Sequence, residues 1–339
     1  MANICAGQIS KIVLPDLRLC CPFPIRMSPH VDEVSQASDQ WIIGGGNITG
    51  ALADSIRGVK SGLLAAAAYP DAGPQELRLC ADFISWLRQF YMDDWTDRMD
   101  QNEARDLSRI VMHIMTHPEE PVSGTGYAQL TQDFWLRLSE AAEAGTRKRF
   151  IDAVCRFFSA VTQQSKDREA GSIPDLETYI LQRRDTGATV TCFALAEYTN
   201  HLVLPDEVLE HPILQNLRDS STDFVDWSND LLSYNVEQSQ GETHNMVCVA
   251  MTEGNLDLQS AVNFVGDMCK SAVVRFMKNK ALVPSWTPEI DAQVVLYVQC
   301  LTDWMSGSLH WSYESERYLG KQGKQVKETG IVDLLPREG

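Results

Sequence analysis

The sequence predicts an all-α protein built as one large helical domain. Apolar residues recur at intervals of three and four along most of the chain, as at Leu79, Phe83 and Trp86, which is the period of a helix with one buried face. Alternating β-branched segments joined by Asn-Gly or Asp-Gly turns are not found, so strands are not expected. No Gly/Ser-rich or Pro-rich linker and no internal repeat divides the 339 residues, which favours a single core.

Each expected helix follows this period, and Gly or Pro stands at most of the boundaries. In chain order the helices are expected at residues 61–69, 75–99, 105–115, 129–144, 146–164, 174–184, 187–201, 222–239, 257–279 and 288–312. The chain is therefore divided into a proline-punctuated N-terminal arm (1–40), an all-α domain (41–319) and a polar C-terminal tail (320–339) that is expected to be poorly ordered.

The charge of the chain limits its partners. Acidic residues outnumber basic residues 46 to 29, which gives a formal net charge of −17. Such a surface repels nucleic acid and anionic membranes, so neither is expected as a partner, whereas cations are. The nine cysteines include no C-x-x-C pair, which argues against a zinc ribbon or a disulfide framework. Without a signal peptide or an apolar run of about 18 residues, a cytoplasmic protein is predicted.

The first candidate site is a cluster of three aspartates, Asp93, Asp94 and Asp97, directly behind an aromatic and apolar run. On a helix Asp93 and Asp97 share one face, and like charges at this spacing destabilise the helix. Carboxylate oxygens are ligands of Mg²⁺, whose charge would offset the repulsion. The pattern alone fits a solvated acidic face equally well.

A second candidate site lies in the segment NDLLSYNVE, where Asn229, Ser233 and Glu237 are spaced by four residues. Each step of four moves around a helix by only about 40°, so the amide, hydroxyl and carboxylate oxygens form one stripe of hard-cation ligands. We call these residues the Asn/Ser/Glu triad. Taken alone, such a stripe is more often an ordinary polar helix face.

Basic residues that could bind a phosphate group stand in two places. Arg183 and Arg184 precede Gly187, which is expected to break a helix, and Arg317 is followed by Tyr318. Metal ions held by a few carboxylates usually share a phosphate-bearing ligand. Alone, each arginine would be a surface ion-pair partner.

Together these motifs resemble those of class I terpene synthases of the microbial type, most of all the basidiomycete sesquiterpene synthases. The motifs stand in the family's order, with DDWTD at 93–97, RRDTG at 183–187, NDLLSYNVE at 229–237 and RY at 317–318. The separations between them are also similar to those of the family. The resemblance implies a single-domain class I terpene synthase (isoprenoid synthase) bundle of helices around a blind, apolar active-site cavity.

The resemblance also implies ligands for metal ions at the mouth of this cavity. Asp93 is expected to bind two Mg²⁺ ions, with Asp94 and Asp97 in supporting roles, and the Asn/Ser/Glu triad is expected to bind a third. Mn²⁺ is expected to be able to replace Mg²⁺.

The same resemblance assigns residues to the substrate. Arg183 is expected to sense the diphosphate group, Thr186 and Gly187 to relay its arrival to a kinked helix, and Arg317 and Tyr318 to donate hydrogen bonds to the diphosphate oxygens. Arg183, Arg317 and Tyr318 are the expected catalytic residues.

Two aromatic residues, Phe90 and Trp311, match family positions that line the cavity. When diphosphate leaves an allylic carbon, positive charge develops on the hydrocarbon, and an aromatic face stabilises such a charge by about 0.5 to 2 kcal/mol. Ordinary core packing is the alternative for both residues.

The expected activity is the Mg²⁺-dependent ionisation of a linear prenyl diphosphate, release of diphosphate and cyclisation to a sesquiterpene by a monomer or homodimer. Chain size and the resemblance to the basidiomycete enzymes favour farnesyl diphosphate as the substrate. One alternative is an acyclic terpene alcohol synthase of the linalool or nerolidol type, acting on geranyl or farnesyl diphosphate. A prenyl diphosphate synthase would need a second aspartate-rich motif, and a non-enzymatic helical scaffold would leave the acidic faces solvated.

The chain departs from the family pattern at two positions. Many relatives carry a basic residue just before the glutamate of the triad or shortly after it, where this chain has Val236 and Gln240. One diphosphate contact is therefore missing, unless Arg184 takes its place.

Overall fold

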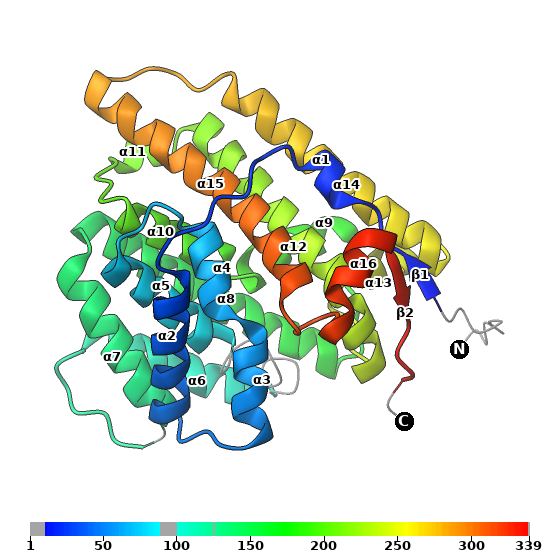
Figure 1. The fold of residues 1–339 in the computed structure, drawn as a ribbon, viewed down its shortest axis with the longest axis horizontal. Coiled ribbons are helices and arrows are strands. Elements are labelled where there is room, and N and C mark those ends of the chain that lie inside the picture. Colours follow the sequence, from blue (N-terminus) through cyan, green and yellow to red (C-terminus); the bar gives the residue numbers. More distant parts are fainter. Residues whose placement is uncertain (1–10, 89–99, 125, 338–339) are drawn as a thin grey trace.

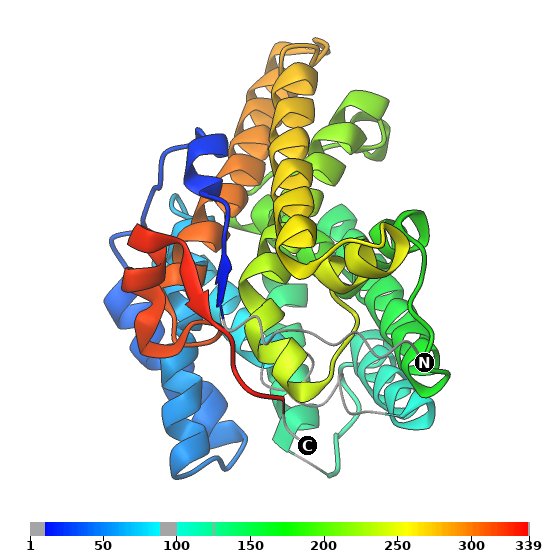
Figure 2. The same ribbon diagram turned by 90° about the vertical axis from the view of Figure 1, so that its right-hand side faces the viewer.

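The computed structural model describes residues 11–88, 100–124 and 126–337. Figures 1 and 2 show a bundle of helices with one two-stranded ribbon at its edge. In chain order the elements are β1 (Lys11–Val13), α1 (Leu17–Cys20), α2 (Val31–Gly45), α3 (Ala51–Val59), α4 (Ser61–Ala68), α5 (Pro74–Leu87), α6 (Gln101–Thr116), α7 (Gly126–Ala141), α8 (Ala144–Glu169), α9 (Leu176–Thr186), α10 (Thr189–Thr199), α11 (Asp206–Leu209), α12 (Pro212–Gln240), α13 (Met246–Glu253), α14 (Leu258–Lys280), α15 (Pro288–Glu314), η2 (Gly320–Gln322), α16 (Gly323–Thr329) and β2 (Ile331–Asp333).

The buried apolar side chains form one continuous core to which nearly every helix contributes, so the prediction of a single all-α domain is confirmed. The cysteines that the structure describes are free thiols. Within the described ranges, no helix is both long enough and apolar enough to cross a membrane.

Helix α12 lies at the centre of the bundle, where it packs against α9, α10, α13, α14 and α15. Every residue from Ser220 to Asn235 is buried except Asn229. This stretch contains Asp223, Asp226 and Asp230, which the helical period places on one face. Because buried carboxylates need partners, this acidic face of α12 requires basic or hydroxyl groups from the helices around it.

Local signals explain why several helices begin where they do. Asp100 caps α6 by accepting hydrogen bonds from the backbone N–H groups of Asn102 and Glu103, and Pro212 occupies the first turn of α12. Proline fits a first turn because no intrahelical donor is needed there. The sequence-based range of 222–239 for this helix is therefore too short. Pro212 was interpreted as a break, whereas it is the first residue of α12.

Helix α13 was not expected from the sequence. Met246, Val247, Val249 and Ala250 are all buried in it, so its apolar residues do not keep to one face and produce no amphipathic period. The side chain of Asn245 accepts a hydrogen bond from the Val247 N–H and caps the helix.

The N-terminal arm and the C-terminal tail meet at one edge of the molecule (Figure 1). Strands β1 and β2 pair antiparallel with Ile12 opposite Val332, and Gln259 of α14 both donates to and accepts from the Val13 backbone. The expectation of a poorly ordered tail is wrong for residues 320–333, because β1 satisfies the backbone groups of β2. The arm boundary at residue 40 stays a prediction, and α2 crosses that position.

Helices α4 and α15 approach each other closely because both present small residues at their contact. A Cβ atom on Gly307 would lie 2.8 Å from the backbone carbon of Ala67. No rotamer change can relieve such a contact, since it is with the main chain.

We therefore predict that Gly307→Ala lowers the free energy of unfolding by about 1–3 kcal/mol through overpacking. Gly44→Ala is the matched control, because a Cβ there has no atom within 4 Å and alanine is the better helix former. Urea unfolding of both variants measures the difference. Equal stability of the two variants would show that α4 and α15 separate easily.

Candidate active site

The Asn/Ser/Glu triad lies on α12 as its spacing predicts. Asn229 Oδ1 accepts a hydrogen bond from Arg183 Nη2 at 2.9 Å, and Asn229 Nδ2 donates to the Tyr318 hydroxyl at 2.6 Å. Glu237 Oε2 accepts from Asn245 Nδ2 at 2.8 Å. The hydroxyl of Ser233 is buried and has no hydrogen-bond partner among the described residues.

Arg183, near the C-terminal end of α9, is buried against α12. Its Nε donates to Asp230 Oδ1 at 2.9 Å. Asp230 Oδ2 accepts from the Tyr179 hydroxyl at 2.7 Å and from the Met246 N–H at 3.0 Å. Burial alone would lower the pKa of Arg183, but the carboxylates of Asp230 and Asp226 outweigh burial and hold the pKa well above its usual value. Arg183 is therefore a fixed positive charge.

Arg317 and Tyr318 lie in the turn that follows α15, and Trp311 lies in the last turn of that helix. The Tyr318 and Trp311 rings are perpendicular, with centroids 5.8 Å apart, and the Trp311 Nε1–H donates to the Val59 carbonyl at 2.7 Å. Burial alone would raise the pKa of Tyr318, but the charges of Arg317 and Arg88 outweigh it and lower the pKa to about 8.

The segment between α9 and α10 is a tight break at Gly187 and Ala188. A Cβ on Gly187 would lie 2.3 Å from Asp226 Oδ1, so only glycine fits against α12 at this point. Ala188 adopts a left-handed conformation with φ of 55°. The hydroxyl of Thr189 donates to Asp226 Oδ1 at 2.8 Å, and burial raises the pKa of Asp226 to about 7 against the opposing charge of Arg183.

Thr186, the other residue expected to act as a relay, is also buried at this break. Its hydroxyl lies 3.4 Å from His244 Nε2. Burial lowers the pKa of His244 to about 3, so this imidazole is neutral.

These elements enclose a cavity between α4, α5, α9, α10, α12 and α15. Its apolar lining includes Leu64, Ile84, Leu87, Val225, Trp304 and Trp311. Its polar lining includes Arg88, Arg183, Thr189, Asp226, Ser228 and Asn229. The volume of this cavity between the described residues is about 50 Å³. Its lining sets apolar walls beside arginines and hydrogen-bond donors, which are the surfaces that a hydrocarbon and an anion respectively require.

The structure therefore joins Arg183, Gly187, Asn229 and Trp311 around one cavity, with Tyr318 bonded to Asn229. The expected residues Phe90, Asp93, Asp94 and Asp97 lie outside the described residues.

Three residues of the site were missed from the sequence: Arg88, Asp226 and Asp230. The three aspartates on one face of an otherwise buried helix were a usable signal for Asp226 and Asp230. Arg88 gave none, because a single arginine after an apolar run is common at helix ends.

Residues 82–275 match the family model described as terpene synthase family 2, C-terminal metal binding. The chain belongs to the terpene synthase family. This terpene synthase is 46% identical to sesquiterpene synthase Agr1 of Cyclocybe aegerita, over 98% of this chain and 96% of the relative. It is 41% identical to alpha-muurolene synthase of Coprinopsis cinerea, over 96% of this chain and 78% of that protein. The crystal structure of germacradien-4-ol synthase from Streptomyces citricolor has the same fold, with a TM-score of 0.74, 21% identity and coverage of 86% of this chain and 96% of that one.

The predicted family and enzyme class are thus confirmed, and the family's description makes a divalent metal part of the synthase. The residues of the triad fit such a group. Ser233 offers a buried oxygen without a described partner, and the carbonyl oxygen of Asn229 has a second lone pair beside the one that Arg183 uses. A cluster of three or more His, Cys, Asp or Glu ligands is not found in the described part of the chain, since the triad contributes only Glu237 of these types.

Arg184 does not take the place of the missing basic residue in this synthase. Its Nε and Nη2 donate to the two oxygens of Asp223 at 2.7 and 2.9 Å, and its Nη1 donates to Asp219 at 3.0 Å. Asp223 is buried and also pairs with Arg275. Arg184 therefore ties α9 to the acidic face of α12, and the suggestion that it binds diphosphate is wrong for this geometry.

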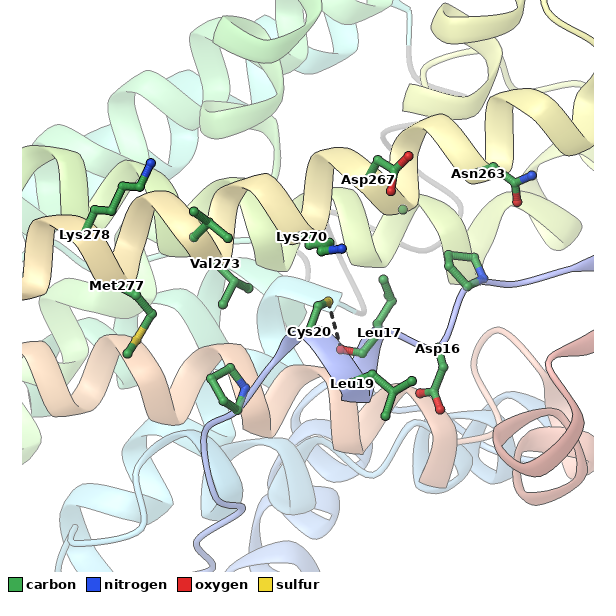
Figure 3. A pocket seen from close by; sticks show the side chains of 14 residues that line it. Asp16, Leu17, Leu19, Cys20, Asn263, Asp267, Lys270, Val273, Met277 and Lys278 are labelled. Carbon is green, nitrogen blue, oxygen red and sulfur yellow. Dashed lines mark hydrogen bonds between the residues drawn. The ribbon is translucent and has the colours of Figure 1, made fainter.

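A larger hollow, of about 860 Å³, lies on the surface of the synthase between the N-terminal arm and α14. Figure 3 shows Leu17, Leu19 and Cys20 of the arm facing Lys270 and Val273 of α14. None of the motif residues that the structure describes lines this groove. Its size therefore does not make it the catalytic centre.

The two neighbouring arginines of α9 are expected to behave differently on substitution. Arg184→Gln should lower the free energy of unfolding by about 1–3 kcal/mol, because it leaves buried Asp223 with fewer charged donors. Its affinity for pyrophosphate with Mg²⁺, measured by calorimetry, should stay within about twofold of the unmodified protein. A large loss of pyrophosphate affinity without a loss of stability would restore Arg184 as a ligand.

Proposed function

We propose that this terpene synthase ionises farnesyl diphosphate, releases the diphosphate and directs the resulting cation to a sesquiterpene. The observation that carries the proposal is the chain of contacts from Arg183 through Asn229 to Tyr318, beside a cavity that contains Trp311. This arrangement sets anion-binding groups beside apolar and aromatic walls. The relatives named as sesquiterpene synthases support a C15 substrate, and none of the relatives reported above is named as an acyclic alcohol synthase.

Two sets of residues would hold the metal ions. The Asn/Ser/Glu triad would bind one Mg²⁺ ion, and Asp93, with Asp94 and Asp97 in support, would bind two more. When bound, these ions stabilise the negative charge that develops on the leaving diphosphate. Mn²⁺ is expected to replace Mg²⁺ in the same positions.

The chain's own donors would bind the diphosphate and orient it. Arg183 is held rigidly by Asp230, so it presents a pre-positioned charge. The Tyr318 hydroxyl accepts hydrogen bonds from Asn229 and Arg88, which leaves its proton to donate to a diphosphate oxygen. Arg317, whose guanidinium lies 5.0 Å from the Tyr318 ring, adds a second charge.

Binding of the diphosphate at Arg183 would affect the break between α9 and α10. The backbone at Gly187 is packed so tightly against Asp226 that no Cβ fits there, so a change in the contacts of Arg183 is passed on to α10 through Thr186, Gly187 and Thr189. We propose this connection as the relay that closes the cavity around the substrate and excludes water from it.

Incubating the purified protein with geranyl, farnesyl and geranylgeranyl diphosphates tests the function. With Mg²⁺, farnesyl diphosphate should give cyclic C15 products by gas chromatography, and Asp93→Ala should abolish turnover while its circular dichroism stays unchanged. Absence of diphosphate release from all three substrates would refute the proposal. Acyclic alcohols as the main products would show that water captures the first cation before it cyclises.

Substitutions in the Asn/Ser/Glu triad should change the Mg²⁺ dependence of the rate. Asn229→Ala and Glu237→Ala each remove an oxygen ligand, so both should raise the Mg²⁺ concentration needed for half-maximal rate and lower kcat. Ser233→Ala should lie between these variants and the unmodified protein. An unchanged Mg²⁺ requirement in all three would reduce the stripe to an ordinary polar face.

Arg317 and Trp311 should affect different steps. Arg317→Ala should slow diphosphate release at a cost of about 2–4 kcal/mol, as when one charge-stabilising donor is lost, with the product ratio largely kept. Trp311→Leu removes an aromatic face and should shift products toward earlier-quenched or acyclic terpenes. Trp311→Phe is the matched control, because it loses the same hydrogen bond to Val59 but keeps a ring. Equal product ratios in both Trp311 variants would contradict a role for the aromatic face.

A further inference from the structure

Arg88, the residue that follows α5, lies on two side chains of the proposed site. Its guanidinium carbon is 4.2 Å from the centroid of the Trp311 ring. Its Nη1 donates to the Tyr318 hydroxyl at 3.2 Å, and its side chain lines the same cavity as Arg183 and Asn229. Arg88 therefore lies where the hydrocarbon wall and the anion-binding groups meet.

The charge of Arg88 is not neutralised by the described parts of the chain. Arg183 is paired with Asp230, and Arg184 is paired with Asp219 and Asp223. No carboxylate in residues 11–88, 100–124 or 126–337 forms an ion pair with Arg88, and its buried Nε lacks a hydrogen-bond partner there. A partly desolvated guanidinium with unused donors is a favourable site for an anion that can accept several hydrogen bonds.

The stacking of Arg88 on Trp311 conflicts with the role proposed for the indole ring. If the ring stabilises a carbocation, a second cation cannot remain on the same face, because like charges at about 4 Å repel strongly in a water-excluded cavity. Arg88 would have to leave this face when the substrate binds. The anion-binding groups are its immediate neighbours, since it already contacts Tyr318.

We propose that Arg88 is a substrate-binding residue that rests on Trp311 in the free protein and moves to the diphosphate when the substrate binds. It thereby supplies the basic contact that is missing at Val236 and Gln240, and it uncovers the indole face for the hydrocarbon. This inference rests on the proposed function, because it needs a diphosphate as the anion.

Titration calorimetry with inorganic pyrophosphate at saturating Mg²⁺ tests the inference without turnover. Arg88→Gln should weaken pyrophosphate binding about tenfold or more, as expected for losing a charged donor, and Arg88→Lys should restore part of it. Arg57→Gln is the control, because Arg57 is an exposed arginine on α3 paired with Asp54, and its affinity should stay within about twofold. With farnesyl diphosphate, Arg88→Gln should raise KM and lower kcat/KM while the product ratio is kept.

The possible outcomes separate this inference from the function itself. Pyrophosphate affinity of Arg88→Gln equal to that of the unmodified protein overturns the role of Arg88 and leaves the synthase activity untouched. If Arg88→Gln keeps its pyrophosphate affinity but shifts the product ratio, Arg88 contacts the hydrocarbon and not the diphosphate. That result also overturns the inference. Failure of the unmodified protein to bind pyrophosphate would contradict the proposed function. If Arg88→Gln does not fold, the same pyrophosphate titration is made with Arg88→Met. The flexible methionine side chain can still cover Trp311.

Discussion

The buried ion pair between Arg183 and Asp230 fixes the geometry of the site, because Asp230 links its own helix to two others. It accepts from Arg183 and Tyr179 of α9 and from the backbone of Met246 in α13, while it belongs to α12. A buried carboxylate with all its partners in place permits little freedom to any of them. Asn229, the next residue on α12, is held by the same arginine, so the triad and the positive charge keep a constant relation.

The acidic face of α12 organises the neighbouring charges in the same way. Asp223 binds Arg184 and Arg275, Asp226 binds Thr189, and Asp230 binds Arg183. Buried carboxylates would destabilise the bundle if these partners were absent, so the helix is held in one register against α9, α10 and α14. Arg88, which lines the cavity and forms no ion pair with the described carboxylates, is then available to an incoming anion.

This distribution also accounts for the proposed binding of a diphosphate by a chain with a net charge of −17. The negative surface does not attract such a ligand, whereas the cavity lining contains Arg88 and Arg183, with Tyr318 close by. Desolvation inside the cavity strengthens each of these interactions relative to water. The apolar wall that includes Ile84, Leu87 and Trp304 borders the same space.

The sequence by itself determined the helical class, the family and the stripe of Asn229, Ser233 and Glu237. These depend on a period of 3.6 residues and on short motifs, which are local properties of the chain. Only the tertiary structure decided which side chain each arginine binds. Arg183 and Arg184 are adjacent and alike in sequence, yet one reaches Asn229 and the other Asp223. The pairing of β1 with β2 and the place of Arg88 on Trp311 were undetermined for the same reason. Partners on different helices are selected by how those helices pack, and a local sequence pattern does not contain that information.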